Sequence, residues 1–242
     1  MRLPEVLTPL ELPLAELNAA RLDGELFALD EGFVPVDQVE GRRHRALALT
    51  QFSAGRLIAE QRTAAWVYGA SPSAPPQHQF CAPMGARVTP RSGWMLRLKV
   101  REVVIDAADV IELSGLRITT PVRTVVDLVR IADVFGDADA ALVRDLMSVT
   151  GVTFEDCRAL MERRRNLPAK RRALDRLERV SASARLLAGA DPIHVVDRID
   201  TTYRVQHPVE VGRVAHLEDE AAECEPVARR GDRRREDVDM IL

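Results

Sequence analysis

The amino-acid sequence predicts an α+β fold in which a small, mostly antiparallel sheet is followed by a helical region. Short β-like runs separated by turn residues occupy residues 78–82, 97–105, 110–113 and 116–119. From residue 121 to residue 188, apolar residues recur instead at helical spacing. With 242 residues, 46% of them hydrophobic, the chain can form one large domain or two small ones. We expect three segments: a small module over residues 1–48, an α+β domain over residues 49–188 and a tail over residues 189–242.

The first segment predicts a reduced winged-helix-like module. A short helix around Leu14 and Leu17 ends at Gly24, and a hairpin can follow with its turn at residues 30–32. A winged-helix module ends in this way, but the segment is too short for a full unit of three helices. Up to residue 50 the chain also holds five arginines against nine acidic residues, which is the wrong balance for a phosphate-facing surface. We therefore expect any DNA contact to lie elsewhere in the chain.

The second segment opens with a predicted helix over residues 60–68. Gly69 should end it, because glycine readily adopts the left-handed conformation that follows a last helical turn. Trp66 and Tyr68 lie on this helix among alanines, which favours core packing over stacking on a nucleic-acid base. Three prolines within residues 71–76 indicate a loop before the strands begin.

A ten-residue stretch from Ile118 predicts the start of the next helix. Thr120 suits the N-cap, since its hydroxyl can accept a bond from an unpaired backbone N–H, and Pro121 suits the first helical position. Arg123 and Asp127 lie one turn apart beside the apolar stripe, and two interpretations stay open. They tie the helix start to the sheet, or they form a ligand-binding or partner-binding pair. The stripe consists of Val122, Val125, Val126 and Val129.

Further helices are predicted up to residue 188. Thr153 and Asp156 have the spacing of a capping box, and Asn166 and Pro168 interrupt the chain before the last helix. The expected buried face of that helix consists of Leu174, Leu177, Val180, Ala184 and Leu187.

A basic cluster within seventeen residues is the strongest functional feature outside the helix start. Helical spacing places three of its members, Arg172, Arg176 and Arg179, on an exposed face opposite Leu174 and Leu177. Such a face can contact phosphates of DNA or RNA, or an acidic partner. The alternative is an ordinary solvated helix face. The candidate DNA-binding residues are Arg163, Arg164, Arg165, Lys170, Arg171, Arg172, Arg176 and Arg179.

The tail over residues 189–242 has a different composition. It holds thirteen acidic residues against eight arginines and shows neither helical nor strand periodicity. Two interpretations are equally favoured: a true acidic tail, or translation in a frame that was never selected for folding. In either case we expect the tail to be dispensable for folding.

Several classes of protein are disfavoured by the sequence. The three cysteines, Cys81, Cys157 and Cys224, are far apart and odd in number, which fits reduced thiols in the cytoplasm rather than disulfides or a zinc site. We predict no metal, no cofactor and no catalytic residue. No apolar run approaches the length of a membrane helix, and residues 1–20 do not resemble a secretory signal. Glu60 and Glu102 invite a nuclease interpretation, but neither lysine lies in the Glu-x-Lys context that such a site needs.

Two blocks resemble the AbiEi-type antitoxin family, which is common in actinobacteria. Residues 115–128 are similar to its signature G-x-x-V-T-[ST]-P-x-R-T-x-x-D-L, and residues 53–69 are similar to its helix S-x-x-[ST]-A-A-x-x-[WH]-G. The order and spacing of the blocks also match, and together they cover roughly residues 50–180. The motif residues are Trp66, Gly69, Thr120, Pro121, Arg123, Thr124 and Asp127.

The resemblance implies a non-enzymatic, cytoplasmic antitoxin with an AbiEi C-terminal-like domain over residues 49–188. Members of the family typically bind operator DNA through a winged helix, repress a toxin operon and counter a nucleotidyltransferase-like toxin without stable binding. DNA and a functional toxin partner are therefore the expected partners, and no oligomeric state is implied. One alternative is a protein-interaction module that has lost DNA binding. A second is a relative of a nuclease fold.

Overall fold

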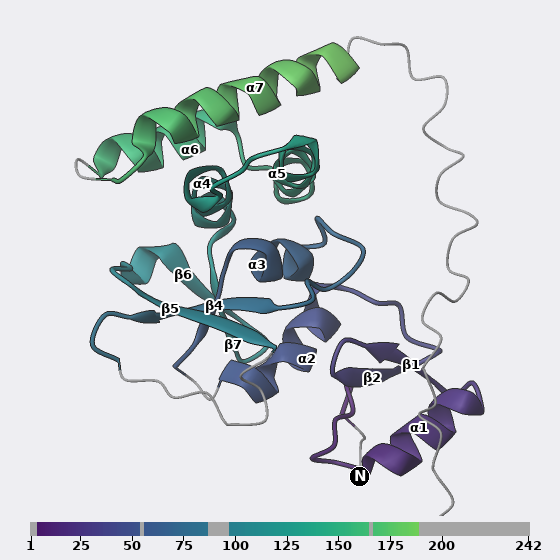
Figure 1. Cartoon of the computed structure of the whole chain (residues 1–242). Helices are drawn as coiled ribbons and strands as arrows, with labels where there is room; N and C mark the ends of the chain where they lie inside the picture. Colours follow the sequence, from purple (N-terminus) through teal and green to yellow (C-terminus); the bar gives the residue numbers. More distant parts are fainter. Residues whose placement is uncertain (1–3, 54–55, 87–96, 165–166, 189–242) are drawn as a thin grey trace, which may run out of the picture. The chain divides into compact units, whose positions relative to one another are not determined.

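The computed structural model describes residues 4–53, 56–86, 97–164 and 167–188, all within one compact unit (Figure 1). Its helices and two sheets confirm the α+β class. The predictions for residues 189–242 and for Arg165 lie outside the described residues. In the part of the chain that the structure describes, no helix has the length and apolar character needed to cross a membrane.

The N-terminal part consists of helix α1 (Leu14–Leu22) and the antiparallel hairpin of β1 (Leu26–Leu29) and β2 (Gly32–Pro35). The predicted helix and hairpin are thus present, while their winged-helix character stays a prediction. A small apolar cluster of Leu7, Leu17, Leu26 and Phe33 holds α1 against the hairpin. Gly32 lets Val6 pack closely on β2, because a Cβ there would lie 2.6 Å from the side chain of Val6, which would have to shift.

The central sheet has five strands in the order β5-β4-β3-β7-β6. The antiparallel pairs are β3–β4 and β6–β7, whereas β4–β5 and β3–β7 are parallel. The sheet is therefore mixed, and the prediction of a mostly antiparallel arrangement is wrong for it. Two features cause the difference. β3, a strand of two residues that the sequence pattern does not reveal, lies between β4 and β7 and runs parallel to β7, and β5 runs parallel to β4. The strands are β3 (Ile58–Ala59), β4 (His78–Pro83), β5 (Leu98–Val103), β6 (Val110–Leu113) and β7 (Leu116–Thr119).

Of the helices that the structure describes, all except α2 were predicted. α3 (Gln61–Tyr68) ends at Gly69, whose φ of 95° lies in the left-handed region. The capping box of α6 is present, with Thr153 Oγ1 accepting from the Asp156 backbone N–H at 3.2 Å. The unpredicted helix α2 packs against α3 and β7. The remaining helices are α2 (Arg42–Ser53), α4 (Pro121–Ile131), α5 (Asp137–Thr150), α6 (Phe154–Arg163) and α7 (Lys170–Ala188).

Helix α4 occupies a central position. It contacts α3 on the side of the sheet and also α5, α6 and α7, so it lies between the sheet layer and the outer helices (Figure 1). Val125, Val126 and Val129 of α4 are buried, as the predicted stripe requires. Trp66 of α3 is almost fully buried in the same core, which confirms the core-packing interpretation of that residue.

Candidate functional site

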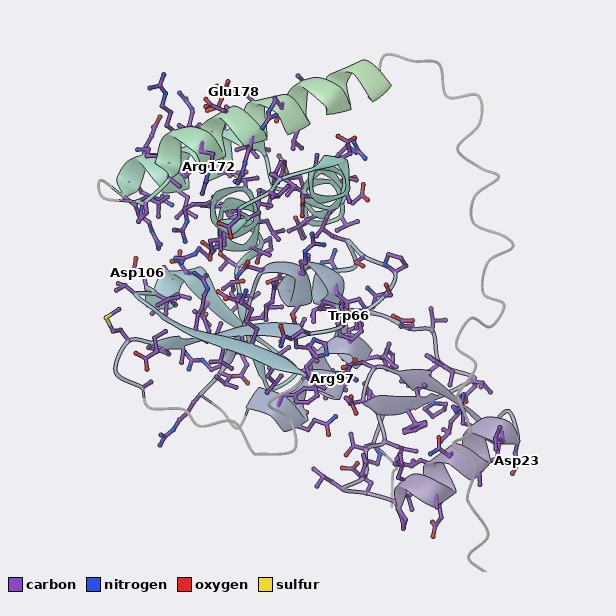
Figure 2. The ribbon with its side chains drawn as sticks, viewed as in Figure 1. Asp23, Trp66, Arg97, Asp106, Arg172 and Glu178 are labelled. Carbon is purple, nitrogen blue, oxygen red and sulfur yellow. The ribbon has the colours of Figure 1, made fainter. Side chains whose placement is uncertain are left out.

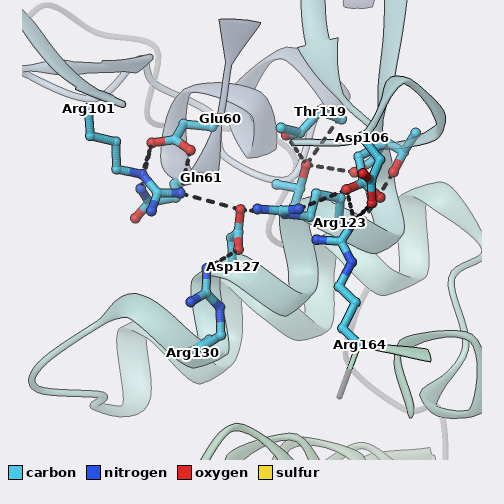
Figure 3. A network of polar contacts seen from close by, with 12 residues as sticks. Glu60, Gln61, Arg101, Asp106, Thr119, Arg123, Asp127, Arg130 and Arg164 are labelled. Atoms are coloured by element: carbon cyan, nitrogen blue, oxygen red, sulfur yellow. Dashed lines mark hydrogen bonds and ion pairs between the residues drawn. The ribbon is translucent and has the colours of Figure 1, made fainter. Parts of the chain in front are cut away.

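A continuous network of ion pairs surrounds the start of α4 (Figure 3). Glu60 precedes α3, and both of its carboxylate oxygens accept from Arg101 of β5, at 2.5 Å from Nε and 2.5 Å from Nη2. The same Nη2 lies 3.4 Å from Oδ2 of Asp127 on α4. The network therefore begins at the sheet and passes directly into the helix.

Arg123 continues the network from Asp127 to Asp109. Its Nε donates to Asp127 Oδ2 at 2.8 Å and its Nη1 donates to Asp109 Oδ2 at 2.7 Å. Arg130, one turn further along α4, donates to the other oxygen of Asp127 at 2.8 Å. Arg164, which follows α6, completes the chain by pairing with both Asp109 and Asp106. Asp127 and Asp109 each accept from more than one guanidinium group, and Glu60 accepts from two nitrogens of the same one.

Burial distinguishes this network from a surface ion pair. Arg123 is 3% exposed and Asp127 is 1% exposed. Burial lowers the pKa of the Arg123 guanidinium, but Asp127 and Asp109 outweigh that effect and raise it above its ordinary value. Removal of one partner of such a pair leaves an uncompensated buried charge. The geometry supports the interpretation that Arg123 and Asp127 tie the helix start to the sheet.

Hydroxyl groups fix the backbone beside the network. Thr120 Oγ1 accepts from the Arg123 backbone N–H at 3.4 Å, and Pro121 occupies the first turn, as the sequence predicted. Thr124 Oγ1 lies 2.8 Å from Thr119 Oγ1 and donates to the Thr120 carbonyl at 2.9 Å. The Tyr68 hydroxyl donates to the Thr119 carbonyl at 2.6 Å, which joins α3 to the same turn. These residues hold the strand-to-helix junction in place.

The sequence predicted only Arg123 and Asp127 as a pair, and six further residues join them. Arg164 was expected to contact DNA and is instead paired with two carboxylates. The six are Glu60, Arg101, Asp106, Asp109, Arg130 and Arg164. Glu60 invites a nuclease interpretation in the sequence, but in the structure both of its carboxylate oxygens are held by Arg101. The sequence offers one usable signal, an arginine in the middle of a short strand at Arg101. Across the described ranges, no group of three or more His, Cys, Asp or Glu side chains is arranged to hold a metal ion.

A pocket of about 610 Å³ adjoins the network between the α4 start and α6. Arg164 contacts Asp106 and Asp109 within it, and Arg163 is exposed at its wall. Two of the three acidic groups of the pocket are paired with Arg164, and the third, Asp156, accepts from Thr153. The lining consists of Asp106, Ala108, Asp109, Thr120, Val122, Asp156, Ala159, Leu160, Arg163 and Arg164.

A second buried polar group joins the β1–β2 turn to the sheet. His78 of β4 is fully buried, with Nε2 2.8 Å from Asp30 Oδ2 and Nδ1 3.4 Å from Thr63 Oγ1. Arg97 donates to the other oxygen of Asp30 at 2.8 Å. An Asp-His-hydroxyl set is also found in hydrolases. Here Thr63 is fully buried and its oxygen accepts from the Gln79 backbone N–H at 2.7 Å, so the set anchors the hairpin.

The basic cluster divides into buried and exposed members. Arg176 is only 6% exposed, and its guanidinium donates to the carbonyls of Val129 at 2.9 Å, Ala132 at 2.7 Å and Asp133 at 3.2 Å. The same group lies 5.1 Å from the centre of the Phe135 ring. The prediction that Arg176 belongs to an exposed face is therefore wrong.

The physical reason is that the buried face of α7 keeps Leu177 and Val180, as predicted, but extends on one side to Ala173 and Arg176. Ala173, Arg176, Leu177 and Val180 point inward, and Leu174 is only partly buried. A charged Arg176 is tolerated at this buried position because the last carbonyl groups of α4 have no partner in the helix itself and accept from its guanidinium. The structure does not describe the side chains of Ala184 and Leu187, so their burial stays a prediction.

The remaining members form a smaller basic surface. Arg164 is partly buried and committed to Asp106 and Asp109. Arg172 projects from α7 and donates to the Arg130 carbonyl at 3.2 Å, and the acidic Glu178 is exposed on the same helix (Figure 2). We use the term exposed basic surface for Arg163, Lys170, Arg171, Arg172 and Arg179, of which Lys170 is partly exposed and the others are exposed.

Comparisons with known proteins place this site in a family. Residues 54–171 match the family model described as AbiEi antitoxin C-terminal domain, and the α4 start with its ion pairs lies inside that range. A solved structure, the crystal structure of the RV2827C protein from Mycobacterium tuberculosis, is similar at 21% identity with a TM-score of 0.39, over 76% of each chain. A search of curated proteins finds no match.

Proposed function

Residues 54–171 belong to the AbiEi antitoxin C-terminal domain family, and on that premise we propose that the chain is a non-enzymatic antitoxin that regulates its operon by binding DNA. The family match is the observation that carries the antitoxin role. The toxin is then a functional partner, encoded beside this chain, that need not form a stable complex with it. The same proposal assigns the protein to the cytoplasm.

The charge distribution supports DNA contact through the exposed basic surface. Arg171, Arg172 and Arg179 are exposed on one helix, where guanidinium groups can reach successive phosphates. The N-terminal part has the opposite balance, with nine acidic residues against five arginines up to residue 50. A phosphate backbone is therefore attracted by α7 and repelled by the N-terminal part.

The ion-pair network supports a non-enzymatic role. Glu60, Asp109 and Asp127 are each buried, and each is engaged by at least one guanidinium. A catalytic carboxylate has to reach a substrate proton or a metal ion. These carboxylates instead stabilise the junction of the sheet with α4.

An anisotropy titration with duplex DNA from upstream of the gene tests the DNA proposal. Charge reversal at Arg171, Arg172 and Arg179 should weaken binding and reduce the slope of log K against log salt by about three units, because each lost phosphate contact lowers it by about one. The matched control reverses three exposed arginines elsewhere, Arg21, Arg43 and Arg158, and should leave the slope close to that of the wild type.

The opposite ranking, with the loss traced to Arg21 and Arg43 and not to Arg158 of α6, would restore DNA recognition by the N-terminal module. A wild type that does not bind at low salt would remove DNA from the proposal and favour the alternative, a protein-interaction module. The antitoxin role has a separate test, since co-expression with the product of the neighbouring toxin gene should relieve growth arrest. Unrelieved arrest would refute that role whatever the DNA result.

A further inference from the structure

Helix α1 exposes apolar side chains on the side that faces away from its own hairpin. Leu17 is fully buried against the hairpin, whereas Leu14 is 54% exposed and Leu22 is 79% exposed. Ala15 and Ala19 are exposed as well. A surface helix normally turns polar residues outward, so the outward face of α1 departs from the usual pattern.

The outward residues form one stripe along the helix. Leu14, Ala15, Asn18, Ala19 and Leu22 follow the spacing i, i+1, i+4, i+5 and i+8, which places them on a single face. The two leucines lie at the ends and the alanines lie between them. Small residues in the middle allow a second helix to approach to the usual packing distance of about 8–10 Å. We call this face the α1 stripe.

The chemistry of the α1 stripe does not fit DNA. A helix that reads the major groove presents side chains that hydrogen-bond to base edges and phosphates. Within the stripe only Asn18 carries a polar group. The stripe fits the apolar face of another helix, as in recognition of an amphipathic helix by a hydrophobic surface.

The charges around the α1 stripe select the kind of partner. Four acidic residues near it are exposed, and Arg21 is the exposed cation of α1 (Figure 2 shows Asp23 at the end of the helix). A second copy of this chain would bring acidic groups together, which costs free energy. A helix with basic flanks would instead be attracted. The acidic residues are Glu11, Glu16, Asp23 and Glu25.

We propose that the α1 stripe is a docking site for an amphipathic helix with basic flanks from a partner protein. The apolar side chains of that helix pack between Leu14 and Leu22 over the two alanines. Its lysines or arginines reach Glu16 and Asp23 at the rim. This surface is distinct from the exposed basic surface of α6 and α7, so the two can act independently.

A designed peptide of about 18 residues tests the proposal by titration against the full chain. It carries leucines at the spacing of the stripe and lysines on its flanks, and a companion peptide carries glutamates in place of the lysines. The lysine peptide should bind and the glutamate peptide should not. L14S/L22S should weaken binding at least about tenfold, and E16K/D23K should reverse the preference between the peptides.

Val134→Ser is the matched control, because Val134 is a large apolar residue that is 85% exposed outside the N-terminal part. It should leave peptide binding unchanged. L14S/L22S should melt within about one degree of the wild type, since both leucines are exposed. A drop of several degrees would show that the stripe is already covered, and this would overturn the proposal. Equal binding of both peptides, or a dimer abolished by L14S/L22S in sedimentation, would overturn it as well.

Discussion

Asp127→Asn is the sharpest perturbation of the ion-pair network. The Asp127 carboxylate is 1% exposed and accepts from Arg123, Arg130 and Arg101. Asparagine has nearly the same shape but no charge. The three guanidinium groups would then face one another with fewer negative charges between them, while the packing around the side chain is retained.

The expected cost follows from burial. Breaking a buried ion pair by neutralising one partner costs about 3–5 kcal/mol of unfolding free energy. At about 2–4 °C for each kcal/mol in a chain of this size, the melting temperature should fall by about 6–20 °C. Thermal and urea unfolding followed by circular dichroism would measure both quantities.

Arg158→Gln serves as the control. Arg158 lies 2.8 Å from Glu155 on α6, but the two side chains are 49% and 68% exposed. Exposed pairs contribute about 0–1 kcal/mol, so this variant should melt close to the wild type. If Asp127→Asn were as mild as Arg158→Gln, the network could not be what holds α4 on the sheet.

Four further outcomes are expected. Thr120→Ala should cost about 0.5–2 kcal/mol of unfolding free energy in urea titrations, because an N-cap is lost; no change would show that the long 3.4 Å bond is dispensable. Arg176→Met should lower the melting temperature more than Arg172→Met does, since three carbonyl groups lose their donor; equal shifts would contradict the burial of Arg176. Deletion of residues 189–242 should leave the melting temperature unchanged, and a loss of several degrees would show that the tail is integrated. Burial raises the pKa of the Cys157 thiol to about 12, so maleimide at pH 8 should label it only after denaturation; labelling of the native protein would place the thiol at the surface.

Local signals made much of the fold predictable. The start of α4 could be located from Thr120 and Pro121 alone, since an N-cap and a first-turn proline act within a few residues. The end of α3 at Gly69 and the capping box of Thr153 and Asp156 are equally local. Each of these predictions is confirmed because tertiary contacts reinforce the local preference.

The rest depended on contacts between distant residues. β3 contributes two residues to the sheet and has no periodicity to detect. Arg101 meets Glu60 across 41 positions, and Arg164 meets Asp109 across 55. Arg176 was misplaced because helical spacing alone does not show that unpaired carbonyl groups of another helix await a donor. Charged residues are usually exposed, and the exceptions can be recognised only when their partners are known.

A basic helix has to be held on the rest of the domain and has to present positive charge outward. In α7 the first task falls largely to Arg176. Its three bonds to the end of α4 help to set how α7 is rotated about its own axis, and Arg172 adds one more, to the Arg130 carbonyl. Arg171 and Arg179 therefore do not have to hold the helix in place. Mutations at Arg171 and Arg179 should therefore change the charge of the exposed basic surface at little cost in stability. Related proteins are expected to vary in their outward arginines and to retain the inward one.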